Sequence, residues 1–214
     1  LDPPYGDSVP YMEFSMMWNS FLKLDINLSK DISVSDKNNK KFESWKKYKS
    51  SLIDRMNLFK QILAKKGKLL VTFNNHDHRA WEALVEALQK CDFYCNKTMY
   101  QIPAVISSKA QFSKDGSYIS DIYSVFKHKK NFKFIESLNL LKKDVLKSTQ
   151  LRNGLISKTC LYRTIYMSIL KNNISFKIIN NLDKFIKENF DIIKNNYYLK
   201  NYKKLKISKL KKIV

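Results

Sequence analysis

Leu1-Asp2-Pro3-Pro4-Tyr5 is the stretch of sequence from which the fold is predicted. Each proline holds φ at about −65° and lacks an N–H group, so the segment is stiff and its carbonyls are left as acceptors. The residue before each proline is driven towards extended geometry, which places the Asp2 carboxylate beyond the end of a strand. The segment therefore presents a carboxylate, free carbonyls and an aromatic ring close together.

The same segment resembles motif IV of the amino-group methyltransferases, the enzymes that methylate adenine N6 or cytosine N4 in DNA. The resemblance continues through residues 6–15 (GDSVPYMEFS), which are similar to a longer form of the motif in a subset of bacterial adenine-specific DNA methylases. Residues 67–73 are similar to the next strand of that family, and residues 80–88 to the helix after it. All these segments lie within residues 1–128.

The resemblance implies a role for each residue of the motif. The Asp2 carboxylate and the Pro3 carbonyl would accept hydrogen bonds from the exocyclic amino group, which favours the nucleophilic form of the amine. The ring of Tyr5 would stack on the base after the base has left the duplex. An aspartate at the first position favours adenine N6 over cytosine N4. The catalytic set is Asp2, Pro3, Pro4 and Tyr5, and the substrate-binding set is Tyr5, Gly6, Pro10, Tyr11 and His76.

Such an enzyme requires S-adenosylmethionine, which the family binds through a glycine-bearing loop after its first strand. The chain has four glycines, and no two of them are close enough in sequence to form that loop. We therefore expect the chain to be the C-terminal part of a longer or split methyltransferase. An upstream segment or subunit would complete the cofactor site, and the chain would be inactive without it.

The hydrophobic pattern predicts an α/β protein. Strands are expected at residues 69–73, 93–105 and 118–127, and helices at residues 13–23, 42–66 and 79–89. This order predicts the C-terminal half of a Rossmann-like methyltransferase sheet, open and mostly parallel, with a final hairpin. The run at 69–73 is typical of a strand buried on both faces. The apolar stripe of the first helix is interpreted as core packing against the sheet.

Two histidines and two cysteines suggest a zinc site at first sight: His76, His78, Cys91 and Cys95. A predicted helix separates the two pairs, and the chain has no Cys-x-x-Cys motif, so we expect no metal. His76 follows the predicted strand, where it could line the base pocket or contact DNA. The alternative is an exposed turn in which Asp77 caps the next helix.

The positive charge of the chain is concentrated in its second part. The chain has a net charge of +21; residues 127–214 hold 22 Lys and Arg against 5 Asp and Glu, a net of +17. We predict that residues 129–214 form a basic α-helical region that contacts DNA, because neutralising phosphates releases counterions. The alternative is a compositional drift towards lysine with no partner. Three cysteines fit a reducing cytoplasm, and no apolar run is long enough to predict a membrane span.

These observations predict a site-specific DNA methyltransferase that modifies adenine N6, as in restriction-modification systems. Two alternatives remain open. The first is a non-catalytic, basic nucleic-acid-binding module with a methylase-like fold. The second is a methyltransferase that acts on RNA.

Overall fold

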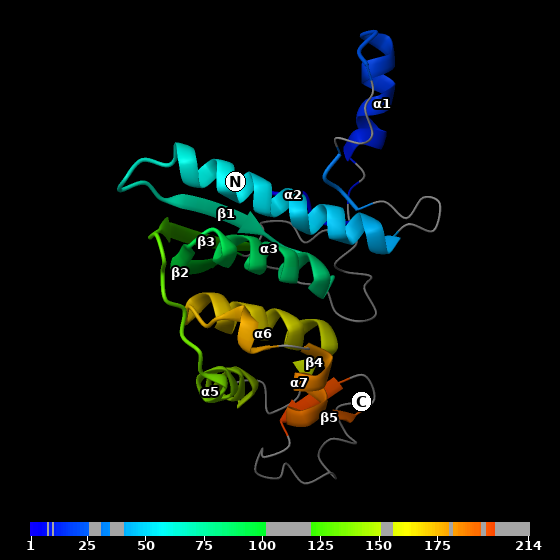
Figure 1. Cartoon of the computed structure of the whole chain (residues 1–214). Helices are drawn as coiled ribbons and strands as arrows, with labels where there is room; N and C mark the ends of the chain where they lie inside the picture. Colours follow the sequence, from blue (N-terminus) through cyan, green and yellow to red (C-terminus); the bar gives the residue numbers. More distant parts are fainter. Residues whose placement is uncertain are drawn as a thin grey trace. The chain divides into compact units, whose positions relative to one another are not determined.

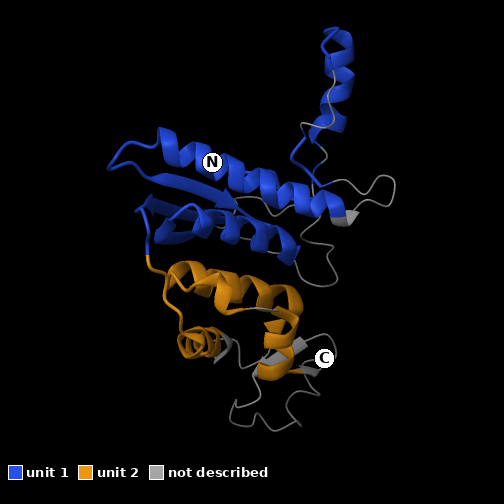
Figure 2. Ribbon diagram, viewed as in Figure 1, with its two compact units in different colours: residues 1–104, 119–132 blue, residues 105–118, 133–214 orange. Residues whose placement is uncertain are grey.

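The computed structural model describes residues 1–7, 9, 11–25, 31–34, 41–101, 121–150, 156–179, 182–193 and 196–199. The chain is a mixed α/β protein with two compact units. Unit 1 holds residues 1–104 and 119–132, and unit 2 holds residues 105–118 and 133–214 (Figure 2). Unit 1 ends at Phe132, and the sequence-based boundary after residue 128 stays a prediction. Phe132 belongs to unit 1, where its ring stacks on that of Tyr94, with centroids 4.5 Å apart.

Unit 1 contains a three-stranded sheet with the order β1-β3-β2 (Figure 1). The strands are β1 (Leu69–Phe73), β2 (Phe93–Gln101) and β3 (Asp121–His128). Both pairings are antiparallel, so the prediction of a mostly parallel sheet is wrong for these strands. The reason is that β3 lies between the other two. β1 and β2 run in the same direction but do not pair with each other, and the predicted final hairpin of β2 and β3 is present.

Successive side chains of β1 alternate between the core and the surface, so only one face of the strand is fully buried. Leu69, Val71 and Phe73 are buried, whereas Leu70 is 44% exposed. Phe73 packs edge-on against Trp81, with ring centroids 4.8 Å apart. The expectation that β1 is buried on both faces is therefore wrong for Leu70.

Two helices supply most of the core of unit 1: α2 (Lys41–Ile62) and α3 (His78–Lys90). The apolar residues of α2 lie on one face, as a helical period requires. α3 begins at the Asp77 cap, whose carboxylate accepts from the Arg79 backbone N–H at 2.8 Å. Lys49 of α2 forms an ion pair with Glu86 of α3 and so ties the two helices together. The buried residues of the two helices are Trp45, Tyr48, Leu52, Met56, Ala80, Trp81, Ala83, Leu84, Val85, Ala87 and Leu88.

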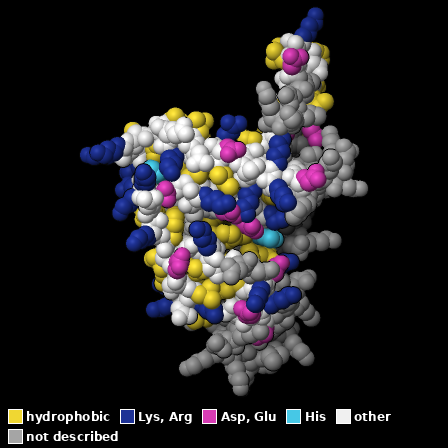
Figure 3. Space-filling model, viewed as in Figure 1, with side chains coloured by type: hydrophobic (Ala, Val, Ile, Leu, Met, Phe, Trp, Pro, Cys, Tyr) yellow, Lys and Arg dark blue, Asp and Glu magenta, His cyan; other side chains and the backbone are white. Residues whose placement is uncertain are grey.

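The first helix, α1 (Tyr11–Phe21), differs most from its prediction. Its helical period is as expected, but none of its residues is buried. Phe14, Trp18 and Phe21 are 67%, 62% and 76% exposed, and apolar side chains are visible at its surface in Figure 3. The interpretation of this stripe as core packing is wrong for the described structure. Residues of α2 and α3 fill the core of unit 1 instead, and periodicity alone does not identify what a stripe packs against.

Unit 2 combines helices with short strands. The helices are α5 (Leu138–Gln150), α6 (Lys158–Lys171), the 3-10 helix η3 (Phe176–Ile178) and α7 (Leu182–Asn189). β4 (Ile156–Ser157), β5 (Phe190–Ile193) and β6 (Asn196–Leu199) form an antiparallel sheet of order β4-β6-β5. The prediction of a purely helical region is therefore wrong.

The core of unit 2 is built around α6. Ser157 caps this helix by accepting from the Cys160 backbone N–H at 3.3 Å. Asn172, just after α6, donates to Asp144 of α5 at 3.1 Å, which ties the two helices together. The described residues of unit 2 therefore have a packed core of their own. The buried residues of α6 are Leu161, Tyr162, Ile165, Tyr166, Met167, Ser168, Ile169 and Leu170.

The contrast between α1 and α3 can be tested through stability. Leu88→Ala removes a fully buried side chain and should lower the free energy of unfolding by about 2 to 5 kcal/mol. Phe14→Ala on α1 should change it by less than about 0.5 kcal/mol. Urea unfolding followed by tryptophan fluorescence measures both, because all three tryptophans lie in unit 1. An equal loss of stability in the two variants would contradict the exposed position of Phe14.

Candidate functional site

The first residues of the chain are joined to the edge of β1 that β3 does not occupy. The Leu1 nitrogen donates to the Leu70 carbonyl at 2.7 Å, and the Thr72 N–H donates to the Leu1 carbonyl at 2.9 Å. Bonds to residues on either side of Val71 are the pattern of a parallel pairing. The segment after Leu1 therefore runs in the same direction as β1, and Asp2 lies beside Thr72, towards the carboxyl end of the strand.

The Asp2 side chain is exposed and is held through one of its two oxygens. Its Oδ1 atom accepts from the Tyr5 hydroxyl at 2.5 Å and from the Thr72 hydroxyl at 3.0 Å. The Tyr5 ring is partly buried and contacts Phe73 of β1, with ring centroids 5.5 Å apart. The Asp2 carboxylate and the Tyr5 ring are therefore adjacent, as the sequence predicts.

Three successive carbonyls after Pro3 are occupied by donors from other parts of unit 1. The Pro4 carbonyl accepts from the Tyr48 hydroxyl at 2.6 Å. The Tyr5 carbonyl accepts from the Asn75 side chain at 2.8 Å, and the Gly6 carbonyl accepts from the Val34 N–H at 2.9 Å. Within the ranges that the structure describes, the Pro3 carbonyl accepts no hydrogen bond.

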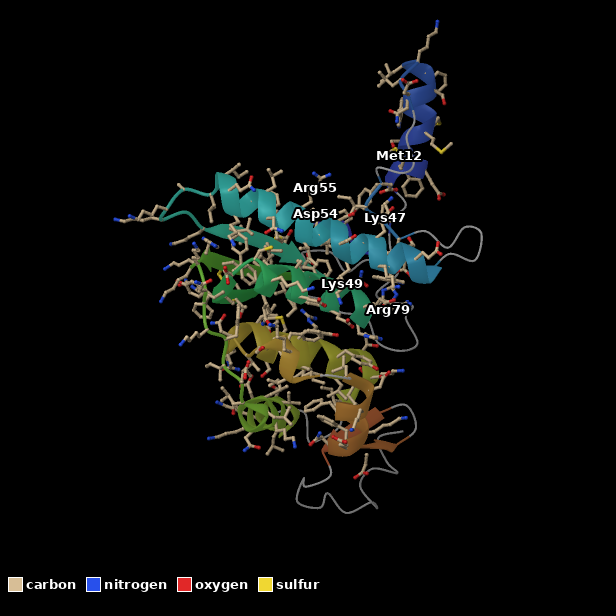
Figure 4. All side chains as sticks on the ribbon, viewed as in Figure 1. Met12, Lys47, Lys49, Asp54, Arg55 and Arg79 are labelled. Atoms are coloured by element: carbon tan, nitrogen blue, oxygen red, sulfur yellow. The ribbon has the colours of Figure 1, made fainter. Side chains whose placement is uncertain are left out.

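Gly6 ends the motif in a left-handed conformation that favours glycine. Its φ is +58°, and a Cβ atom there would lie 2.7 Å from Cη2 of Trp45. The guanidinium of Arg79, labelled in Figure 4, lies 4.5 Å from the centre of the same Trp45 ring. Gly6 thus lets the motif approach α2 closely.

The remaining predicted substrate contacts are not all at the motif. Tyr11 is the first residue of α1, and burial together with the charge of Asp2 raises the pKa of its hydroxyl. Pro10 lies outside the described residues. His76 is exposed in the turn between β1 and α3, where its neighbour Asp77 caps α3 as the sequence suggests. No described hydrogen bond joins His76 to the motif, so its role in binding a base stays a prediction.

The residues that hold the motif were not identified from the sequence. Tyr48 lies 44 positions from Pro4, Thr72 lies 70 positions from Asp2, and Asn75 lies 70 positions from Tyr5. Asn75 is buried, and its backbone carbonyl accepts from the Trp81 indole at 2.9 Å. An asparagine in the turn after a predicted strand is the local signal in the sequence that could have indicated such a contact.

Tyr5 of the motif and Tyr48, which holds the motif, both keep their protons at neutral pH. Burial raises the pKa of Tyr5 above its ordinary value of 10.0, and the hydrogen bond to Asp2 and the charge of Asp2 raise it further. Burial also raises the pKa of Tyr48. Each hydroxyl is therefore a donor over the physiological pH range.

The cysteines and histidines do not gather. Among the described residues, no group of three or more His, Cys, Asp and Glu side chains is placed to hold a metal ion. Cys91 and Cys95 are buried free thiols, and burial raises the pKa of Cys95 to about 11. In the same ranges, no helix has both the length and the apolar composition that a membrane crossing requires.

Comparison with known proteins adds no assignment. No protein-family model, curated protein or solved structure matches the chain. The residues and their geometry therefore carry the functional interpretation.

Replacing Asp2 tests the hydrogen bond from Tyr5 directly. In Asp2→Ala, the pKa of Tyr5 should fall towards 10.0, because an acceptor and a negative charge are lost. It should stay above 10.0, since burial is the largest cause of the shift and remains. An NMR titration of ring-labelled tyrosine measures this change. Asp121→Ala, which removes a weaker charge effect, is the control and should shift the pKa less; an unchanged Tyr5 titration in Asp2→Ala would contradict the contact.

Proposed function

We propose that this chain carries the catalytic motif of a DNA methyltransferase that modifies an exocyclic amine, most specifically adenine N6 of a flipped base. The observation that carries the proposal is the arrangement of acceptors at residues 2–6. Asp2 offers an exposed carboxylate, and the carbonyl of Pro3, a buried residue, accepts no hydrogen bond within the described ranges.

An exocyclic amino group has two hydrogens and needs two acceptors as its nitrogen becomes nucleophilic. The carbonyls of Pro4, Tyr5 and Gly6 already accept from unit 1. These bonds fix the backbone, and on this proposal the Asp2 carboxylate and the Pro3 carbonyl are the acceptors for the amine. Acceptors that are held in place before the reaction stabilise developing charge without reorganisation.

Tyr5 fits the proposed role of a stacking platform. One side of its ring is supported by Phe73, and the side chain is only partly buried. A base that leaves the duplex loses its stacking, at a cost of a few kcal/mol, and an aromatic face recovers part of it. The ring therefore supplies a surface for the base next to the two acceptors.

The fold of unit 1 supports a Rossmann-like methyltransferase half. The parallel bonds of Leu1 place the motif towards the carboxyl end of β1, the end of a strand at which open α/β sheets bind ligands. The antiparallel hairpin of β2 and β3 agrees with the final hairpin that the resemblance implies. On this proposal, the described sheet is the terminal part of a larger one.

S-adenosylmethionine would supply the methyl group. This chain lacks a glycine-rich cofactor loop, since its four glycines are widely spaced. We therefore propose that a further segment or subunit carries that loop. The residues of this chain would bind and orient the amine, and the assembled enzyme is defined as this chain joined to or mixed with the cofactor-binding polypeptide.

The proposal predicts that Asp2→Ala lowers the rate of methyl transfer by about 100-fold or more in the assembled enzyme. DNA affinity should stay within about threefold, because the lost interaction matters mainly in the transition state. Single-turnover transfer from radiolabelled S-adenosylmethionine to unmethylated plasmid DNA gives the rate. Asp54→Ala on the exposed face of α2, labelled in Figure 4, is the matched control and should retain the parent rate.

The outcomes separate the alternatives. Transfer to RNA but not to DNA would favour an RNA methyltransferase. DNA binding with no transfer in the assembled parent protein would favour the non-catalytic module. Parent activity in Asp2→Ala would refute the assignment of the motif.

Unit 2 is proposed to contact the DNA backbone. Residues 127–214 hold the net +17 of the sequence, and Lys143 and Lys147 of α5 are exposed. If about six cations meet phosphates, the logarithm of the binding constant should fall against the logarithm of salt concentration with a slope of about −5.

Exchanging a pair of lysines tests this surface without truncating the chain. Lys143→Gln with Lys147→Gln should make the slope shallower by about 1.8 if both contact phosphates. Lys65→Gln with Lys66→Gln removes the same charge from an exposed turn of unit 1 and should leave the slope unchanged. Fluorescence anisotropy on one duplex of mixed sequence measures both. Equal slopes for the α5 variant and the parent would remove α5 from the DNA-binding surface.

A further inference from the structure

The Asp2 carboxylate receives its two hydroxyl donors at the same oxygen. Tyr5 and Thr72 both lie within hydrogen-bonding distance of Oδ1, at 2.5 Å and 3.0 Å. Each carboxylate oxygen has about two acceptor sites. Two donors therefore fill Oδ1, and the oxygen that remains available to a ligand is Oδ2.

Thr72 connects this side chain to the sheet. Its backbone N–H donates to the Leu1 carbonyl at 2.9 Å. Its hydroxyl lies 3.5 Å from the same carbonyl and 3.0 Å from Oδ1 of Asp2. A hydroxyl has one hydrogen to donate, and the shorter distance together with the negative charge favours Asp2. One residue of β1 thus holds both the backbone before Asp2 and the carboxylate itself.

We propose that Thr72 and Tyr5 act as a hydroxyl pair that positions the Asp2 carboxylate, so that Oδ2 faces the amino group of the target base. This inference rests on the proposed function and assigns a second role to Tyr5. Its ring stacks on the base, and its hydroxyl orients the acceptor. Thr72 is a positioning residue, because it acts on the substrate only through Asp2.

The two donors come from different structural elements, so either one can still hold the Asp2 carboxylate when the other is removed. Tyr5 is three residues from Asp2 on the same stiff loop, whereas Thr72 belongs to β1. Asp2 is exposed, so water can replace one lost donor, but water does not fix the direction of the carboxylate. With one hydroxyl left, the rotation of the carboxylate stays restricted. With neither, Oδ1 and Oδ2 exchange freely and the acceptor is no longer preorganised.

A double-mutant cycle on the assembled enzyme tests the pair. Tyr5→Phe keeps the ring and Thr72→Val keeps the shape, while each removes one hydroxyl. We expect each single variant to lower the single-turnover rate about fivefold, and the double variant to lower it about 100-fold, which is more than the product of the two. DNA affinity by anisotropy should stay within about threefold in all of them. Thr72→Ser, which keeps the hydroxyl, should recover the parent rate.

The control is a pair of the same residue types on β2. Tyr94→Phe with Thr98→Val removes a phenolic and an aliphatic hydroxyl from a strand of the same sheet that does not pair with β1. We expect the parent rate in this variant. The melting temperature of every variant is recorded by circular dichroism.

Several results would overturn the proposed positioning role of Tyr5 and Thr72. A double variant within about twofold of the parent rate would do so, and so would losses that multiply without excess. A rate loss that follows a fall in melting temperature and that Thr72→Ser does not rescue would show a structural role only. These results are distinct from failure of the proposed function, in which Asp2→Ala itself keeps the parent rate and the pair has nothing to position.

Discussion

The candidate site depends on one short parallel pairing, in which Leu1 bonds to β1 through the Leu70 carbonyl and the Thr72 N–H. This pairing sets the direction in which the chain leaves the strand edge. It places Asp2 next to Thr72 and Tyr5 next to Phe73. These bonds join the main chain itself to the strand, so they fix the start of the loop directly. The proposed chemistry follows from the position of Asp2 and Tyr5 beside the carboxyl end of β1.

The rest of unit 1 holds the motif by occupying its backbone acceptors. Tyr48 on α2 and Asn75 in the turn after β1 donate to the Pro4 and Tyr5 carbonyls. Those donors are themselves buried among α2 and α3. A rigid loop is therefore supported from two sides, while its first carboxylate stays exposed. The proposed binding of an amino group rests on this combination of a supported backbone and an exposed carboxylate.

The sequence predicted the bounds of helices and strands better than it predicted which elements pack or pair together. β1 has the predicted bounds, α3 and the hairpin strands lie within a few residues of theirs, and Asp77 caps α3 as the turn chemistry suggests. The parallel sheet, the burial of α1 and the wholly helical second unit were wrong. Each of these depends on which element packs beside another. A periodic pattern of apolar residues indicates that an element has an apolar face, but it does not indicate which element covers that face.

The sequence by itself determined the stiffness of Asp2-Pro3-Pro4-Tyr5, the identity of its acceptors and the uneven charge of the chain, because these are properties of residues and their immediate neighbours. Only the tertiary structure decided that β3 lies between β1 and β2, that Gly6 approaches Trp45 and that Thr72 reaches Asp2. Such contacts join residues up to 70 positions apart. They arise when the sheet forms and the core closes, and no local pattern in the chain encodes them.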